Sequence, residues 1–299
     1  MTINPGLKEL GFDQADRVAI IHTDDIGMYQ SANAAFADLW ALGSISSGSV
    51  MVPCPWFPQI STYCQKHPGV DMGVHLTLNS EWKVYRWGPL STVDVRSGLI
   101  DDDGYFHQDP DVTETTADLD LLRLELNAQL SKAMSAGIDV THIDTHMFLL
   151  ASHRFFHTYI QVGLTHDILP VVIRPGSPAW YEWGFDGEHA QTYTAIVEPL
   201  VEQGLPMIDH VSMMNLETPE ERLEEAKQRF DQMPPGLTHF VLHPTTASAE
   251  VSEAAWDWPC RVADYETFMD LELKTHWEQT GVQIIGYREL RDLMRKKIN

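Results

Sequence analysis

The 299-residue chain carries 43 acidic and 20 basic residues, so its formal net charge is −23 with neutral histidine. This charge repels nucleic-acid phosphates and anionic membrane surfaces, and we expect neither as a partner. Hydrophobic residues make up 43% of the chain, which excludes a disordered protein and supports a sizeable core. A neutral ligand, or one presented to a bound cation, fits this composition best.

The three cysteines, Cys54, Cys64 and Cys260, show no metal-type spacing, and an odd number argues against a disulfide framework. Residues 1–10 lack the apolar core of a signal peptide, and no run approaches the length of a membrane helix. We therefore expect a protein of the reducing cytoplasm.

Short β-branched runs alternate with helical patterns along the chain. The runs predict strands at 18–23, 46–52, 71–78, 140–147, 170–174, 207–213, 238–243 and 282–287. The patterns between them predict helices at 30–42, 56–66, 117–136, 154–166, 192–203, 219–233 and 265–280, and from 288 to the C-terminus. This alternation predicts an α/β fold over residues 1–299 as one domain, a TIM-like (β/α) barrel that is regular or else distorted and incompletely closed.

The spacing of these elements is regular except for a long insert after the third strand, at residues 79–116. The insert is rich in glycine and aromatic residues, including Trp82, Tyr85 and Trp87. A long aromatic loop after a barrel strand is typical of a substrate-side loop or lid, and packing on the barrel rim is the alternative.

Two adjacent carboxylates, Asp24 and Asp25, follow the apolar run of the first strand. The carboxyl ends of parallel strands are where ligands and catalytic residues gather. Two close carboxylates repel each other, and a metal ion or an arginine is the usual remedy. Helix capping by one Asp is the alternative for such a pair.

Histidines stand near the ends of three further predicted strands. His75 lies in the third strand, His146 ends the fourth, and His243 ends the seventh. Histidine and aspartate together form a nitrogen-and-oxygen ligand set for a catalytic divalent metal. Asp144 shares a strand face with His146 and is a candidate to orient a ligand, while His142 is a candidate buried structural histidine.

Four ordered motifs resemble the YdjC-like (ChbG-type) carbohydrate deacetylases, which are relatives of the NodB-type polysaccharide deacetylases. The motifs are TDDIG at 23–27, GVHLTL at 73–78, THIDTH at 141–146 and HP at 243–244. The resemblance implies removal of an N-acetyl group from an amino sugar or short oligosaccharide by a metal-dependent hydrolase. It further implies that Asp25, His75 and His146 hold one divalent ion, Zn²⁺ or Mg²⁺.

The resemblance also implies that Asp24 is the general base, that His243 is the general acid, and that Arg174 holds the catalytic carboxylate. The chain departs from the family where many members continue with a His-x-His-x-His run. Here the residues after His146 are Met147, Phe148 and Leu149, so the substrate contacts differ.

Two other functions remain open from the residues alone. Another metal-dependent barrel hydrolase, an amidohydrolase or a phosphoesterase, is the first; His22, His142 and Asp144 would then supply a second metal site. The second is a non-catalytic carbohydrate-binding protein, since tryptophans such as Trp256 and Trp258 offer stacking faces for sugars. A homodimer is compatible with either function.

Overall fold

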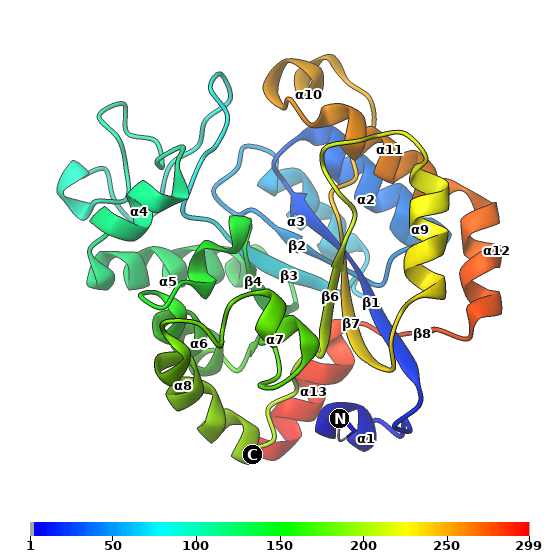
Figure 1. Cartoon of the computed structure of the whole chain (residues 1–299). Helices are drawn as coiled ribbons and strands as arrows, with labels where there is room; N and C mark the ends of the chain where they lie inside the picture. Colours follow the sequence, from blue (N-terminus) through cyan, green and yellow to red (C-terminus); the bar gives the residue numbers. More distant parts are fainter. Residues whose placement is uncertain (1–2, 299) are drawn as a thin grey trace.

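A computed structural model describes residues 3–298 and shows a parallel β-sheet surrounded by helices (Figure 1). The strands are β1 (Arg17–Ile26), β2 (Ser47–Val50), β3 (Met72–Leu76), β4 (Val140–Thr145), β5 (Leu169–Pro170), β6 (His210–Met213), β7 (Gly236–Leu242) and β8 (Gln283–Ile284). They follow the order β5-β4-β3-β2-β1-β7-β6, and β8 pairs with β1. The predicted α/β barrel is thereby confirmed.

The barrel is distorted because β1 has three neighbours and β5 has little contact with β6. On one side β1 pairs with β7; on the other it pairs first with β8 and then with β2. Between β5 and β6 the described residues form only one bridge, Ile173 to Ile208. We call this bridge the seam. There Arg174 N–H donates to the carbonyl of Ile208 at 2.8 Å, and Ile208 N–H donates to that of Val172 at 2.9 Å.

Helices cover the outside of the sheet, with α9, α11 and α12 flanking the β1–β7 side in Figure 1. The α-helices are α1 (Pro5–Glu9), α2 (Gln30–Leu42), α3 (Phe57–Lys66), α4 (Pro110–Thr116), α5 (Leu119–Ser135), α6 (Phe156–Thr165), α7 (Pro178–Glu182), α8 (Ala190–Glu202), α9 (Arg222–Asp231), α10 (Ala249–Ala254), α11 (Trp258–Met269), α12 (Leu271–Thr280) and α13 (Tyr287–Ile298). Two 3₁₀ segments, η1 (Val95–Ser97) and η2 (His146–Ala151), complete the elements. Among the described helices, none is both long and apolar enough to cross a membrane.

The prediction of one helix at 265–280 is wrong, because Asp270 separates α11 from α12. Asp270 has extended backbone angles (φ −75°, ψ 122°), and its carboxylate accepts a hydrogen bond from Glu272 N–H at 2.8 Å. This is the geometry of a helix N-cap, which ends one helix and begins the next. The strands expected at 170–174, 207–213 and 282–287 are shorter than predicted.

The insert between β3 and α5 packs on the rim of the barrel. Trp87 is buried, and its indole N–H donates to the carbonyl of Asn79 at 2.9 Å. The carboxylate of Glu125 on α5 accepts hydrogen bonds from Leu90 N–H at 2.9 Å and from Ser91 N–H at 2.8 Å. These contacts hold the beginning of the insert beside the carboxyl ends of the strands.

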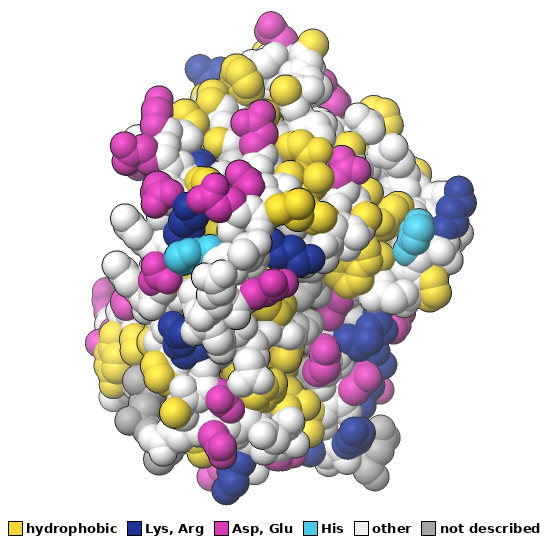
Figure 2. Space-filling model, turned by 90° about the vertical axis from the view of Figure 1, so that its right-hand side faces the viewer, with side chains coloured by type: hydrophobic (Ala, Val, Ile, Leu, Met, Phe, Trp, Pro, Cys, Tyr) yellow, Lys and Arg dark blue, Asp and Glu magenta, His cyan; other side chains and the backbone are white. Residues whose placement is uncertain are grey.

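The excess of acidic residues lies on the surface. On the face drawn in Figure 2, acidic side chains gather in the upper part, and basic side chains are scattered among acidic and apolar ones.

Replacing Phe240 by alanine is expected to lower the free energy of unfolding by about 3–5 kcal/mol, since a large buried ring would leave a cavity. Phe240 on β7 is fully buried, and its ring centroid lies 5.3 Å from that of Phe230 on α9 and 5.9 Å from that of Phe268 on α11. Urea denaturation followed by circular dichroism measures the change. The control Leu124→Ala, at a side chain that is 57% exposed on α5, should stay within about 0.5 kcal/mol of the wild type. Equal losses in the two variants would contradict this packing.

Candidate active site

The carboxylates of Asp24 and Asp25 both reach one site at the end of β1. Asp25 has a positive φ of 61°, which few residues other than glycine, asparagine and aspartate adopt. The pairing register of β1 with β2 also shifts between Thr23 and Ile26. This local turn ends the alternation of side chains along the strand, so neighbouring carboxylates share one opening.

Three side chains converge into a donor set for a metal ion. Asp25 Oδ1 lies 3.1 Å from His146 Nδ1 and 3.6 Å from His75 Nε2, and all three residues are buried. Asp25 Oδ1 makes no hydrogen bond despite its burial, and such orphaned polar atoms call for an explanation. Two imidazole nitrogens and one carboxylate oxygen within 4.8 Å of one another suit a catalytic divalent ion, so the residues present fit the group that the sequence implied.

Both histidines of this set have a carboxylate on their second ring nitrogen. His75 Nδ1 lies 2.8 Å from Asp144 Oδ1, and the hydroxyl of Ser49 donates to Asp144 Oδ2 at 2.8 Å. His146 Nε2 lies 3.0 Å from Glu81 Oε2. Carboxylates in this position fix the orientation of a metal-binding imidazole and raise its basicity. Asp144 therefore has the contact expected for a residue that orients a ligand.

The field around His146 favours positive charge. Burial opposes its protonation, but Glu81 and Asp25 outweigh that effect and raise the pKa of His146 to about 10. A position where two carboxylates hold a proton this strongly is also one where a cation is stabilised.

Arg261 neutralises Asp25 from the side opposite the histidines. Its Nη1 donates to Asp25 Oδ2 at 2.7 Å, and its Nε donates to Asp257 Oδ1 at 2.9 Å. Burial alone would raise the pKa of Asp25, but Arg261 and His146 hold it well below its usual range. These partners favour the ionised form of Asp25.

The prediction that Arg174 holds the catalytic carboxylate is corrected. Its guanidinium contacts Asp209, at the residue before β6 and therefore at the opposite end of the barrel strands. The chain after β5 turns to pair with Ile208, and this pairing carries Arg174 away from Asp24. Arg261, from α11, supplies the guanidinium of the site.

Asp24 faces His75 and His243 with the same oxygen. Its Oδ2 lies 3.8 Å from His75 Nε2 and 3.8 Å from His243 Nε2, while its Oδ1 lies 2.8 Å from His22 Nδ1. Burial opposes the charge on Asp24, but His75 and His22 outweigh it and lower its pKa. An ionised carboxylate beside the donor set has the properties of a general base.

His243 is held by its backbone and leaves its ring facing the site. His243 N–H donates to Asp264 Oδ2 at 3.2 Å, and the ring Nδ1 is buried without a hydrogen bond. Burial lowers the pKa of His243, although Asp25 and Asp24 act in the opposite direction. A histidine with a lowered pKa gives up its proton readily once it is protonated.

His22 and His142 form a buried support beneath Asp24. Their Nε2 atoms lie 2.9 Å apart, and His142 Nδ1 lies 2.9 Å from the hydroxyl of Thr141, which donates to Asp71 at 2.7 Å. Burial lowers the pKa of His142 well below its usual range, as does His22. His142 is buried, as the sequence predicted. A second metal ion bound by His22, His142 and Asp144 would have to replace the contact between the Nε2 atoms of His22 and His142.

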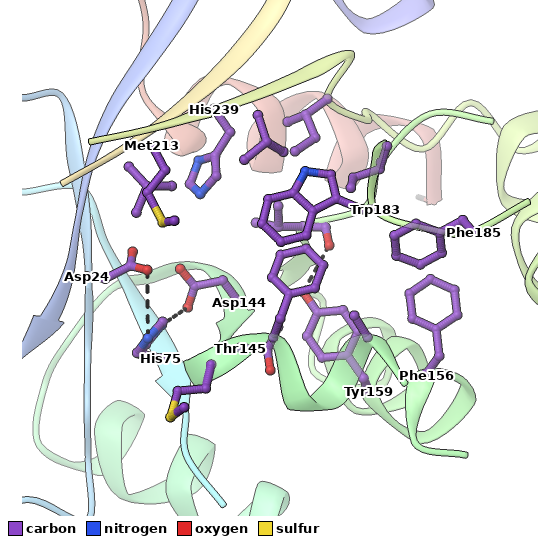
Figure 3. Close-up of a pocket in the computed structure, with 18 of the residues that line it drawn as sticks. Asp24, His75, Asp144, Thr145, Phe156, Tyr159, Trp183, Phe185, Met213 and His239 are labelled. Carbon is purple, nitrogen blue, oxygen red and sulfur yellow. Dashed lines mark hydrogen bonds and ion pairs between the residues drawn. The ribbon is translucent and has the colours of Figure 1, made fainter. Parts of the chain in front are cut away.

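Two recesses meet at this cluster. The first, which we name the outer cleft, has a volume of about 780 Å³ and is bordered by Glu81, Lys83, Trp256 and Trp258. The second, which we name the aromatic cavity, has a volume of about 320 Å³ and includes Trp183. Figure 3 shows it extending from the cluster toward the aromatic side chains between η2, α6 and the loop after α7. Trp256 and Trp258, which the sequence offered as stacking faces for sugars, thus border the outer cleft.

Sequence reasoning missed Glu81 and Arg261. Glu81 lies in the insert and Arg261 on a helix, so neither follows an apolar strand run, the signal that found the other residues. The aromatic residues of the insert marked it as a substrate-side segment, but nothing in its pattern singled out Glu81.

Comparisons with known proteins identify relatives of this chain. The chain is 31% identical to a carbohydrate deacetylase of Thermus thermophilus over 249 residues, which cover 83% of this chain and 85% of the relative. It is 29% identical to carbohydrate deacetylase 1 of Listeria innocua over 281 residues, which cover 91% of this chain and 99% of the relative. A crystal structure from Enterococcus faecalis, provisionally described as a cellobiose-phosphate cleavage protein, has the same fold (TM-score 0.75, 18% identity, 92% of this chain and 99% of that one).

A family profile described as YdjC-like protein matches residues 18–279, which include every residue of the cluster. The resemblance drawn from the four sequence motifs is therefore confirmed, and the chain belongs to the YdjC-like protein family.

Proposed function

We propose that this protein is a metal-dependent carbohydrate deacetylase that hydrolyses the N-acetyl amide of an amino sugar or short oligosaccharide. The observation that carries the proposal is the convergence of the donor set Asp25, His75 and His146 with Asp24 and His243 on one opening. The names of its relatives in Thermus and Listeria support the same reaction.

Asp25, His75 and His146 would hold the metal ion. A divalent ion there supplies a Lewis acid for the amide carbonyl and lowers the pKa of bound water from 15.7 toward about 7. Two imidazoles and one carboxylate suit Zn²⁺ better than Mg²⁺, which prefers oxygen ligands and keeps several waters. We therefore favour zinc.

The remaining residues handle protons on either side of the reacting amide. Asp24, kept ionised by His75 and His22, would accept a proton from the attacking water. His243 would donate a proton to the departing nitrogen, because an amine leaves poorly without one. Arg261 would keep Asp25 charged and fixed in place throughout.

The outer cleft suits a carbohydrate. Trp256, 72% exposed, and Trp258 offer faces for sugar rings, and Glu81 and Lys83 offer partners for hydroxyl groups. An N-acetylated sugar lying there would bring its amide to Asp24 and His243, which border the same cleft.

Purified protein is expected to bind one divalent ion per chain and to release acetate from N-acetylglucosamine oligomers. A chelator should abolish acetate release, and added Zn²⁺ should restore it. Elemental analysis and an enzyme-coupled acetate assay measure the two quantities. His75→Ala and His146→Ala should lose the metal, whereas the control His153→Ala, at a side chain that is 43% exposed, should keep it. Two ions per chain would favour a phosphoesterase, and an absence of metal after reconstitution would favour a carbohydrate-binding protein.

Asp24→Asn and His243→Gln are each expected to lower kcat by about 10²- to 10⁴-fold, the usual contribution of a positioned acid or base. Because neither residue belongs to the donor set, metal content should remain that of the wild type. Steady-state kinetics with metal analysis of the same samples tests both statements. His67→Gln, at the exposed residue that caps the C-terminal end of α3, serves as the control. Near wild-type turnover in either metal-loaded variant would refute its role.

The apparent affinity for the metal is expected to fall by about 100-fold between about pH 8 and about pH 6, or tenfold per pH unit for one displaced proton. Without metal, Glu81 and Asp25 outweigh burial and raise the pKa of His146 to about 10, so binding must displace a proton. Lower pH favours that proton and weakens binding. Competition with a chromophoric chelator at each pH measures the affinity. If the affinity did not change with pH, metal binding would not displace a proton from His146.

A further inference from the structure

The aromatic cavity is walled mainly by apolar side chains. Phe148 of η2 stacks on Trp183, with ring centroids 4.1 Å apart and an interplanar angle of 20°. Ile173, Ile208 and Val211 form part of the opposite wall, beside the seam. If β5 and β6 were paired along more of their length, their residues would close this part of the barrel wall. The cavity lies at this incompletely paired place.

Away from the catalytic cluster, the polar groups of the wall are already bonded or uncharged. The hydroxyl of Tyr159 donates to the carbonyl of Ile143 at 2.7 Å and also lies 3.1 Å from that of Val171. His239 Nδ1 lies 2.8 Å from the hydroxyl of Tyr287, and burial lowers the pKa of His239 to about 3, so it stays neutral. A sugar ring in this cavity would leave most of its hydroxyl groups without partners, at a cost of about 1–3 kcal/mol each.

The cavity is also much larger than an acetyl group requires. A methyl group takes about the space of one water molecule, whose share of liquid volume is about 30 Å³. The cavity has a volume of about 320 Å³, close to the lower limit of pockets that bury whole ligands. An acetyl group would leave most of it empty.

The catalytic cluster lies where the cavity meets the outer cleft. Asp24, His75 and His243 border both recesses, as do Met147 and Met213. Met147 and Phe148 have positive φ values of 49° and 59°, a strained conformation that holds Phe148 in the cavity wall. An amide at this junction would have its sugar in the outer cleft, the more polar of the two recesses, and its acyl group in the aromatic cavity.

We propose that the protein also hydrolyses amino sugars whose nitrogen carries a hydrophobic acyl chain of about four carbons or more, and that it prefers these amides to the N-acetyl amide. This inference rests on the proposed function and extends the range of acyl groups of that reaction. Water adds its hydroxyl to the acyl carbon and the C–N bond breaks. The nitrogen leaves as the amine of the sugar after taking a proton, and the acyl group leaves as a carboxylate.

The test is hydrolysis of N-acetyl-, N-butanoyl-, N-hexanoyl- and N-octanoylglucosamine by the zinc-loaded protein. Every substrate yields the same amine, so one fluorescent amine assay reports all of them. The value of kcat/KM is expected to rise about fourfold per added methylene, the equivalent of about 0.8 kcal/mol, until the chain fills the cavity. An acetyl group preferred over every longer chain would overturn the inference and leave the proposed function standing. No hydrolysis of any amide by the metal-loaded protein would refute both.

A cavity-filling variant tests where the chain lies. Val211→Phe on β6 should remove the preference for longer chains, because the larger side chain would take up space in the cavity that the acyl chain needs. Val201→Phe, at a side chain that is 44% exposed on α8, is the matched control and should keep the preference. A preference that survives Val211→Phe in a folded, metal-loaded protein would overturn the assignment of the cavity. Faster hydrolysis of octyl glycosides of N-acetylglucosamine, without any effect of acyl length, would also overturn it and assign the cavity to the aglycone.

Discussion

The burial of two adjacent carboxylates at the end of β1 is the constraint on which the site depends. An ionised carboxylate taken out of water loses several kcal/mol of solvation unless charged or hydrogen-bonding groups replace the water. Here His22 meets Asp24, while Arg261 and His146 meet Asp25. These partners come from β1, α11 and η2, so the carboxylates are compensated only when distant parts of the chain have folded together.

Much of the fold and the site could be predicted because parallel strands bring their carboxyl ends to one edge. Each strand-end residue, such as His75 or His243, follows an apolar run that can be recognised locally. Arg261 could not be found in this way, because a helix residue reaches the site only through tertiary packing. The prediction for Arg174 was wrong for a related reason. The sequence shows an apolar run before Arg174, but it does not show that this run pairs with Ile208 and so directs Arg174 away from the site.

The irregularities of the barrel could not be predicted either, and they shape the chemistry. Whether a run such as 170–174 forms a full strand depends on its pairing partner, which periodicity does not specify. The position of β8 on β1 and the single bridge at the seam arise in the same way. One consequence is a site with two recesses, of which the outer cleft is the more polar, where a regular barrel would have been filled by side chains.

The seam also bears on how this barrel moves. Local opening of a protein follows the places with few hydrogen bonds between elements, and in the described residues only the bridge between Ile173 and Ile208 joins the β5 side of the sheet to the β6 side. Amide protons of residues 172–174 and 208 should therefore exchange with solvent sooner than those of β1 and β7. A molecule in the cavity would touch both sides of the seam, so binding and barrel closure would reinforce each other by mass action. Bound substrate would then fill the gap in the barrel wall between β5 and β6 for as long as it stays bound.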